Sequence, residues 1–302
     1  MKRRCDTGVF LICPLIIVFC ISCRTTYQSY VDVSGYDFTK PDKILVLPDT
    51  LREISGLTYL GNHTIACVQD ENGIVFLYDI EKNEIQRQFD FHGNGDYEGM
   101  AHIGDTLYVL QSDGVLFRIA DFSSGRCAAI SYPTNIPSGN NEGLCYDAAN
   151  HQLLIACKGK LGKGVEFKDK RAVFAFDIVK HELSSEPVIQ FDLQEIKQFC
   201  TDHRIDLPVR SKKNGTIEEP VLKFRPSAIA IHPVSGKLFV LSAVDHMLFI
   251  FSDDGIIEHA ELLDPALFNK AEGISFMDNA GLLISNEGQE GKPTLLLFSF
   301  KK

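Results

Sequence analysis

The amino-acid sequence predicts an all-β protein that folds as a five-bladed β-propeller. Three observations support this prediction: a short motif recurs five times, apolar strands follow each copy, and one spare strand precedes the first copy. The copies are Ser55-Gly56-Leu57, Glu98-Gly99-Met100, Glu142-Gly143-Leu144, Ser227-Ala228-Ile229 and Glu272-Gly273-Ile274. Consecutive copies start 43, 44, 85 and 45 residues apart. A repeat of about 40–45 residues with four strands is typical of a propeller blade.

Each copy of the motif opens the first strand of a repeat, and turns rich in Gly, Asn and Asp separate the strands that follow. The predicted second strands are Thr64–Val68, Thr106–Leu110, Gln152–Cys157, Lys237–Leu241 and Gly281–Ser285. The predicted third strands are Ile74–Ile80, Val115–Ile119, Ala172–Ile178, Met247–Phe251 and Thr294–Phe300. Four repeats add a fourth strand, at Ile85–Phe91, Cys127–Tyr132, Pro187–Phe191 and Ile256–Leu262. The last repeat lacks a fourth strand of its own.

The strand Lys43–Leu47 lies upstream of the first repeat and belongs to no other unit. If it pairs with the last repeat, it supplies the missing fourth strand. This pairing closes the ring and hides two open sheet edges. We therefore expect the ring to be closed by an N-terminal strand.

The interval of 85 residues before the fourth copy is nearly twice the repeat length. Residues 158–170 are predicted to be an insertion between the second and third strands of the third repeat. Residues 193–220 are predicted to be a second insertion, and its first half has apolar residues at helical spacing (Leu193, Ile196 and Phe199). A helix and a loop account for the extra length, so five blades are expected. A degenerate sixth blade is the alternative.

The N-terminus has the composition of an export signal. Lys2, Arg3 and Arg4 precede an uncharged run, Val9–Ser22, that is shorter than the about 20 residues a spanning helix needs. The run ends in Cys20-Ile21-Ser22-Cys23, which resembles a bacterial lipobox with Cys20 at the position usually held by Leu. The pattern predicts a lipoprotein signal peptide, with Cys23 as the lipidated residue. A plain secreted protein and an uncleaved anchor are the alternatives.

These patterns predict three parts of the chain: a signal peptide over residues 1–22, a tether over 23–40 and one propeller domain over 41–302. It places the protein in the envelope of a bacterial cell. A lipid would hold it to a membrane, with the propeller facing the periplasm.

Composition excludes several classes of function. The net charge is −10, and nucleic-acid binding needs a basic face. Of the nine cysteines, four lie in the first 23 residues, and those in the body form no CxxC pair that would hold zinc. Cys67 and Cys157 occupy the same Ile-Ala-Cys slot of two repeats, so we expect them to be packed strand residues.

The first residues of the five motifs should form a ring around one mouth of the central channel. The ring consists of Ser55, Glu98, Glu142, Ser227 and Glu272. Converging carboxylates repel one another unless a cation lies between them or some are protonated. Carboxylate and hydroxyl oxygens are the ligands that Ca²⁺ prefers, so a calcium site is predicted here. The alternative is that these residues form structural hydrogen bonds repeated from blade to blade.

Other polar residues near the motifs are weaker candidates for the site. Glu53 and Asp96 precede two copies of the motif and are candidates to add metal ligands or to pair with basic residues across the axis. Asp70–Asn72 and Asn286–Glu287 end second strands, where ordinary hairpin turns are expected. Lys158–Gly164 is expected to be a solvated loop, since it lacks the spacing of a phosphate-binding loop.

The motifs together resemble those of the SdiA-regulated family of YjiK-like, calcium-regulated propellers. The resemblance covers roughly residues 42–302 and lies in short strings that begin at Glu53, Tyr97, Asn141, Pro226, Ala271 and Ile284. It implies a five-bladed propeller, distantly related to NHL repeats, with bound calcium and no firmly established reaction. The positions that match the acidic ones of the family are Glu98, Glu142 and Glu272.

Two functions from different classes follow from this reading. The first is a calcium-binding propeller that recognises a protein partner or a small ligand. The second is a calcium-dependent hydrolase of lactonase or phosphoesterase type, in which Glu53 would be the base that activates water. A scaffold without metal is a further alternative. Fold alone does not decide among them.

Overall fold

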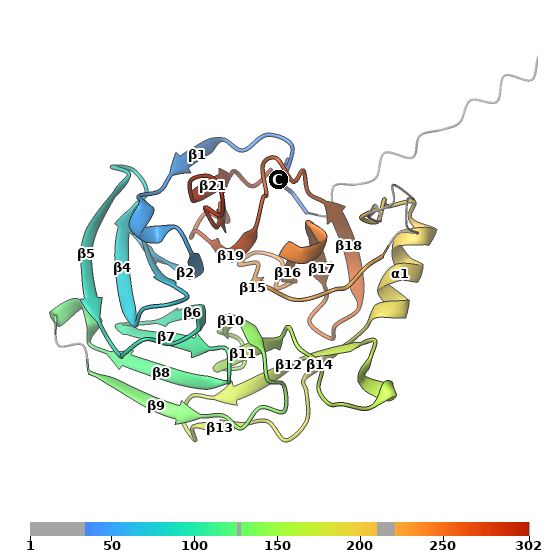
Figure 1. The fold of residues 1–302 in the computed structure, drawn as a ribbon, viewed down its shortest axis with the longest axis horizontal. Helices are drawn as coiled ribbons and strands as arrows, with labels where there is room; N and C mark the ends of the chain where they lie inside the picture. The colour runs from blue at the N-terminus through green and yellow to red at the C-terminus, as the bar shows by residue number, and fades with distance from the viewer. Residues whose placement is uncertain (1–33, 126–127, 210–220, 302) are drawn as a thin grey trace, which may run out of the picture. The chain divides into compact units, whose positions relative to one another are not determined.

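The strands form five antiparallel sheets around a common centre, and the fold is a five-bladed β-propeller (Figure 1). The computed structural model describes residues 34–125, 128–209 and 221–301. The described residues, from Ser34 onward, belong to one compact unit. The predicted fold class is therefore confirmed, and the sixth blade is not found among the described residues.

The first four sheets each take consecutive strands of the chain, ordered from the centre outward. Blade 1 consists of β2 (Ile54–Gly61), β3 (Thr64–Gln69), β4 (Ile74–Asp79) and β5 (Glu84–Asp90). Blade 2 consists of β6 (Tyr97–Ile103), β7 (Thr106–Gln111), β8 (Val115–Ala120) and β9 (Ala129–Pro133). Blade 3 consists of β10 (Asn141–Asp147), β11 (Gln152–Cys157), β12 (Lys170–Asp177), β13 (Glu182–Leu183) and β14 (Ile189–Asp192). Blade 4 consists of β15 (Ala228–Ile231), β16 (Leu238–Ser242), β17 (Met247–Phe251) and β18 (Ile257–Leu262).

Blade 5 combines both ends of the propeller. Its strands are β19 (Ala271–Phe276), β20 (Leu282–Asn286), β21 (Thr294–Phe298) and β1 (Lys43–Val46). β1 pairs antiparallel with β21 from Lys43 opposite Leu297 to Val46 opposite Thr294, so the predicted ring closure is confirmed. Leu45 and Leu47 are 6% and 2% exposed and pack between blades 5 and 1.

Apolar residues fill the spaces between neighbouring blades because each inner strand is covered on both faces. β16 is buried along its whole length, whereas the outer strand β5 alternates between exposed and half-buried residues. Cys67 and Cys157 are fully buried in β3 and β11, as their repeated slot predicts.

Residues 34–40, which the sequence analysis assigned to the tether, belong to the propeller. Tyr36 and Phe38 are 3% and 6% exposed and pack with apolar residues of blades 4 and 5. Tyr36 donates its hydroxyl hydrogen to the carbonyl oxygen of Ala280 at 2.5 Å, and the Nε2 atom of His232 lies 3.0 Å from that hydroxyl. The tether is therefore shorter than predicted. The signal peptide, Cys23 and residues 24–33 lie outside the described residues.

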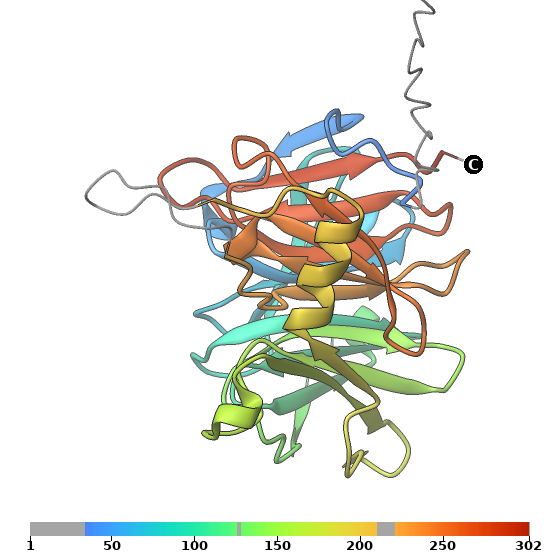
Figure 2. The ribbon, with the colours of Figure 1, turned by 90° about the vertical axis from the view of Figure 1, so that its right-hand side faces the viewer.

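The long interval between blades 3 and 4 is occupied as predicted, by an insertion and a helix. Residues 158–170 connect β11 to β12 and contain one short 3₁₀ turn, Val165–Phe167. The helix α1 (Leu193–Asp202) buries Leu193, Ile196 and Cys200 and lies against the outside of the ring beside β14 and β18 (Figure 2). No helix in the described part of the chain is long and apolar enough to cross a membrane. Residues 210–220 are outside the description.

The first insertion lies at one end of the channel. All innermost strands start at the same end, and neighbouring strands in each blade are antiparallel. Connections from second to third strands therefore lie at that end. We call this end the mouth face. It carries the segment 158–169 and the ring of motif residues, whereas α1 packs against the outside of the ring.

Candidate functional site at the channel mouth

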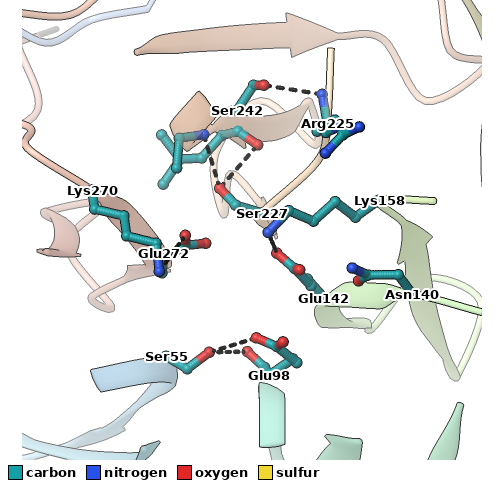
Figure 3. A network of polar contacts seen from close by, with 12 residues as sticks. Ser55, Glu98, Asn140, Glu142, Lys158, Arg225, Ser227, Ser242, Lys270 and Glu272 are labelled. Carbon is teal, nitrogen blue, oxygen red and sulfur yellow. Dashed lines mark hydrogen bonds and ion pairs between the residues drawn. The ribbon is translucent and has the colours of Figure 1, made fainter. Parts of the chain in front are cut away.

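The three glutamates of the ring point into one space because each stands at a β-bulge. The pairing register of the innermost strand shifts between Tyr97 and Gly99, between Asn141 and Gly143, and between Ala271 and Gly273. The extra residue of a bulge is left unpaired and its side chain is redirected. Glu98, Glu142 and Glu272 are these extra residues, and Figure 3 shows their carboxylates facing one another across the channel.

The glycine after each glutamate lets adjacent innermost strands touch. A Cβ atom on Gly99 would lie 2.6 Å from the Cβ of Leu144, and one on Gly56 would lie 2.6 Å from the carbonyl carbon of Gly99. Below the glutamates the channel is lined by Leu57, Met100, Leu144, Ile229 and Ile274. The space left there is about 10 Å³, room for roughly one water molecule. The carboxylates therefore lie above a constriction of the channel.

The two serines of the ring bind the neighbouring blade. The Oγ atom of Ser55 lies 3.0 Å from the carbonyl oxygen and 3.1 Å from the Oε2 atom of Glu98. Ser227 donates its hydroxyl hydrogen to the carbonyl oxygen of Ala271 at 2.9 Å. These bonds join blade 1 to blade 2 and blade 4 to blade 5, which favours a structural role for both hydroxyl groups.

Two lysines compensate the charge of the carboxylates. The Nζ atom of Lys158 lies 2.5 Å from Oε2 of Glu142, whose side chain is 3% exposed. The Nζ atom of Lys270 lies 2.6 Å from Oε2 of Glu287 and 3.5 Å from Oε1 of Glu272. Lys158 is not among the predicted site residues, because its segment was expected to be a solvated loop.

A signal for Lys158 was present in the repeat itself. Lys158 directly follows β11, as Asp70 follows β3 and Glu287 follows β20. The three residues therefore occupy one slot of the repeat, at the mouth end of the second strand. An alignment extended to this slot would have shown charged residues in three of the five blades, with Ser112 and Ala243 in the other two.

Of the residues expected in ordinary turns, two belong to the mouth cluster and one is structural. Glu287 is 7% exposed and belongs to the mouth cluster. Asp70 also belongs to it, because Glu53 and Glu287 act on its carboxylate electrostatically. Asn286 is structural: its amide donates to the carbonyl oxygen of Leu267 at 3.1 Å and to Thr294 at 3.0 Å.

Burial and mutual repulsion change the protonation of the cluster. Burial, with the charges of Glu142 and Asp96, raises the pKa of Glu98 to about 9. Burial also raises the pKa of Glu142 to about 7, although Lys158 acts in the opposite direction. Burial raises the pKa of Asp70 to about 6, with Glu53 and Glu287 adding to the effect. At neutral pH Glu98 is therefore protonated, and it lies beside carboxylates that carry charge.

The lysines respond in the opposite sense. Burial opposes the charged form of both, but the carboxylates of Glu272 and Glu142 raise the pKa of Lys158 above its ordinary value. Glu287 and Glu272 do the same for Lys270. Both ammonium groups are therefore charged at neutral pH.

The residues present do not fit a preformed calcium site. Calcium takes six to eight oxygen ligands. Within the described ranges no group of three or more His, Cys, Asp or Glu side chains is arranged to hold a metal ion. Glu142 and Glu272 instead face ammonium groups, which supply the positive charge that the sequence analysis assigned to calcium. Calcium binding stays a prediction, and an ion would have to compete with Lys158 and Lys270.

No family model and no curated protein sequence matches the chain, so the resemblance to the SdiA-regulated family stays a prediction. Solved structures do match. The glutaminyl cyclase of Myxococcus xanthus is 14% identical, with a TM-score of 0.56 over 86% of this chain and 94% of that one. The PQQ-bound aldose sugar dehydrogenase of Streptomyces coelicolor is 9% identical, with a TM-score of 0.54 over 86% and 97%. These likenesses show the propeller fold alone.

Proposed function

We propose that the protein binds a ligand at the channel mouth and that this recognition is its function. The observation that carries the proposal is a cluster of charged groups at the mouth: Glu142, Glu272 and Glu287 are buried, and Glu98, Lys158 and Lys270 are half-buried beside them. Figure 3 shows all of these residues except Glu287. Burying charges costs stability, so a purely structural core would be better served by apolar residues. Groups with strongly perturbed pKa values gather at functional sites.

The position of the cluster supports the same conclusion. It lies at the mouth face, which also carries the insertion between β11 and β12. Insertions that gather on one face of a repeat protein often mark its binding face.

The chemistry of the mouth favours a ligand with a positive charge. Four carboxyl groups face two ammonium groups in the cluster, and Asp70 and Glu53 add acid at its edge. The proposed ligands are therefore a calcium ion, as the sequence predicts, or a partner that presents an ammonium or guanidinium group. Either must displace or share the contacts of Lys158 and Lys270.

A second candidate function is hydrolysis, and the protonation of Glu98 favours it. A neutral carboxylic acid next to a charged carboxylate is a pairing that can donate a proton to a leaving group and accept one from water. Glu142 is the carboxylate whose charge acts most strongly on Glu98, and Glu53 stays at the edge. Two of the similar structures are enzymes, a cyclase and a dehydrogenase.

A calorimetric titration of Ca²⁺ into the EDTA-treated chain lacking its first 23 residues tests the mouth. We expect weak, saturable binding, because the ion must compete with two lysines. A Lys158→Gln/Lys270→Gln variant should bind at least about tenfold tighter, which corresponds to 1.4 kcal/mol. A Glu98→Gln/Glu142→Gln/Glu272→Gln variant should not bind.

The controls separate binding from catalysis. Calcium affinity that is equal in the wild type and the lysine variant would contradict competition by lysine, and binding that survives in the glutamine variant would place the ion elsewhere. The same proteins are assayed with lactone, ester and phosphoester substrates. Turnover that falls about 100-fold or more in a Glu98→Gln variant would favour the hydrolase.

We also propose that Cys23 carries a lipid that anchors the propeller outside the cytoplasm. The support is the charged N-terminus, the short uncharged run and the Ser22-Cys23 junction. Cells expressing the chain with labelled palmitate are expected to yield a labelled, membrane-associated protein. A Cys23→Ala variant should be unlabelled, whereas Cys20→Ala, the matched control, should label normally. Label that remains in Cys23→Ala would contradict this assignment.

A further inference from the structure

The outer edge of blade 3 differs from those of the other blades. β12 pairs with two separate segments, β13 through Phe176 and Asp177, and β14 through Lys170–Val173. Residues 184–188 connect the two segments and arch away from β12. A cavity of about 590 Å³ lies beside this arch, with Phe174, Leu183 and Pro187 among its lining residues. We call this cavity the lateral pocket.

The arch is stable because its own atoms satisfy the backbone of β12. Ser184 donates its N–H to the carbonyl oxygen of Ala175 at 2.7 Å and accepts the N–H of Ala175 on its Oγ atom at 3.1 Å. Val188 donates its N–H to the carbonyl oxygen of Val173 at 2.9 Å. The edge of the sheet is therefore closed without a continuous strand, and the space is left open.

The insertion 158–170 covers the other side of the lateral pocket. Leu161, Glu166 and Phe167 line the pocket from this segment. The ring of Phe167 lies against Gly162, where a Cβ atom would come within 2.5 Å of it. Thr134 and Pro137 complete the wall from the loop that leads from blade 2 to blade 3.

The lining combines an apolar body with an acidic rim. Phe174 is buried in the wall, while Leu161, Phe167 and Leu183 are half-buried and present apolar surface. Glu166 and Glu186 are exposed at the pocket. The one basic residue of the lining, Lys170, forms an ion pair with Asp192 that neutralises it. The net charge offered to a ligand is therefore negative.

From this geometry we propose that the lateral pocket binds a small amine with an apolar, ring-containing body. Its volume lies in the range of about 300–1,000 Å³ that small-molecule sites occupy. The apolar walls would cover the ring of the ligand, and Glu166 and Glu186 would pair with its ammonium group. The site is separate from the mouth and does not rest on the function proposed there.

The absence of tryptophan from the sequence makes a direct test possible. A Phe167→Trp variant of the full-length chain in detergent has one indole, at the wall of the lateral pocket. Three probes of one shape are titrated: 2-phenylethylamine, 2-phenylethanol and phenylacetate. We expect a saturable fluorescence change with the amine, at least about tenfold weaker binding of the alcohol, and no binding of the acid. Adding Glu166→Gln/Glu186→Gln should make the amine and the alcohol bind equally.

Ligand-observed NMR on the unlabelled wild type guards against an effect of the new indole. The amine should bind the wild type, and binding should be lost in Ser185→Trp, which fills the pocket from the exposed arch. The Glu98→Gln/Glu142→Gln/Glu272→Gln variant should bind the amine normally. Loss of binding in that variant but not in Ser185→Trp would place the amine at the mouth and overturn this inference. So would equal binding of all three probes, or no saturation by about 10 mM amine.

Discussion

A chain that begins at Pro48 is expected to lose its cooperative unfolding transition and most of its soluble yield. The deletion removes β1, so β21 becomes an open edge of blade 5. It also removes four buried side chains: Tyr36, Phe38, Leu45 and Leu47. Each contributes about 1.5–3 kcal/mol by burial, so the loss is roughly 6–12 kcal/mol, comparable with the whole stability of a typical domain.

Thermal unfolding followed by circular dichroism measures this effect. The matched control begins at Ser34, which keeps Tyr36, Phe38 and β1, and should keep the melting temperature of the lipid-free chain within about 2 °C. A third chain that begins at Lys40 separates the two contributions, because it keeps β1 and loses Tyr36 and Phe38. A full melting temperature in the chain that begins at Pro48 would show that ring closure by β1 does not stabilise the propeller.

Raising the pH from 7 to 9 is expected to destabilise the protein by about 2 kcal/mol through Glu98. The pKa of Glu98 is about 9 in the folded protein, well above the ordinary value of 4.5. Between these two values the folded state holds a proton that the unfolded state has lost, so stability falls as pH rises and is lost fully above the folded pKa. For a domain of this size the change corresponds to a fall of roughly 4–8 °C in melting temperature.

A Glu98→Gln variant isolates the effect, because glutamine resembles the protonated acid and can still accept a hydrogen bond from Ser55. It should already melt higher than the wild type at pH 7, because the unfolded wild type has lost its proton there, and the difference should grow by several degrees at pH 9, as measured by thermal unfolding in the two buffers. Glu71→Gln, an exposed change on the mouth face, is the control and should follow the wild type at both values. Parallel curves for Glu98→Gln and the wild type would mean that Glu98 is already charged at pH 7.

The pH range above 7 is used because a second buried group, His232, changes its charge at lower pH. Burial lowers the pKa of His232, whose Nδ1 atom accepts the N–H of Ser235 at 3.0 Å and whose Nε2 atom faces Tyr36. This histidine therefore contributes to stability in its neutral form, and that contribution falls as pH drops through the ordinary value of 6.5. Above pH 7 the charge of His232 does not change. Glu142, whose pKa is about 7, also loses its remaining proton in this range, so the comparison with Glu98→Gln is needed to isolate the share of Glu98.

The blade count, the closing strand and the helix after blade 3 could be predicted from the sequence. Each is encoded locally: a strand has a period of two, a helix has a period of 3.6, and Glu or Ser followed by Gly or Ala and an apolar residue recurs five times at the inner strands. The repeated glycine after each glutamate, such as Gly99, could be interpreted in the same way, because a residue without a side chain lets neighbouring backbones approach closely.

Which side chains lie in contact depends on the tertiary structure. Tyr36 contacts Ala280, 244 residues further along the chain, and nothing in the local pattern of residues 34–40 distinguishes a docked segment from a tether. Lys158 lies beside Glu142 because the register of β10 against β11 brings both residues to the mouth. Charge pairing depends on distance in space, and burial then sets the protonation of Glu98. The sequence places Lys270 two residues before Glu272, but the distance from each ammonium group to its carboxylate, and the burial that goes with it, are properties of the folded chain.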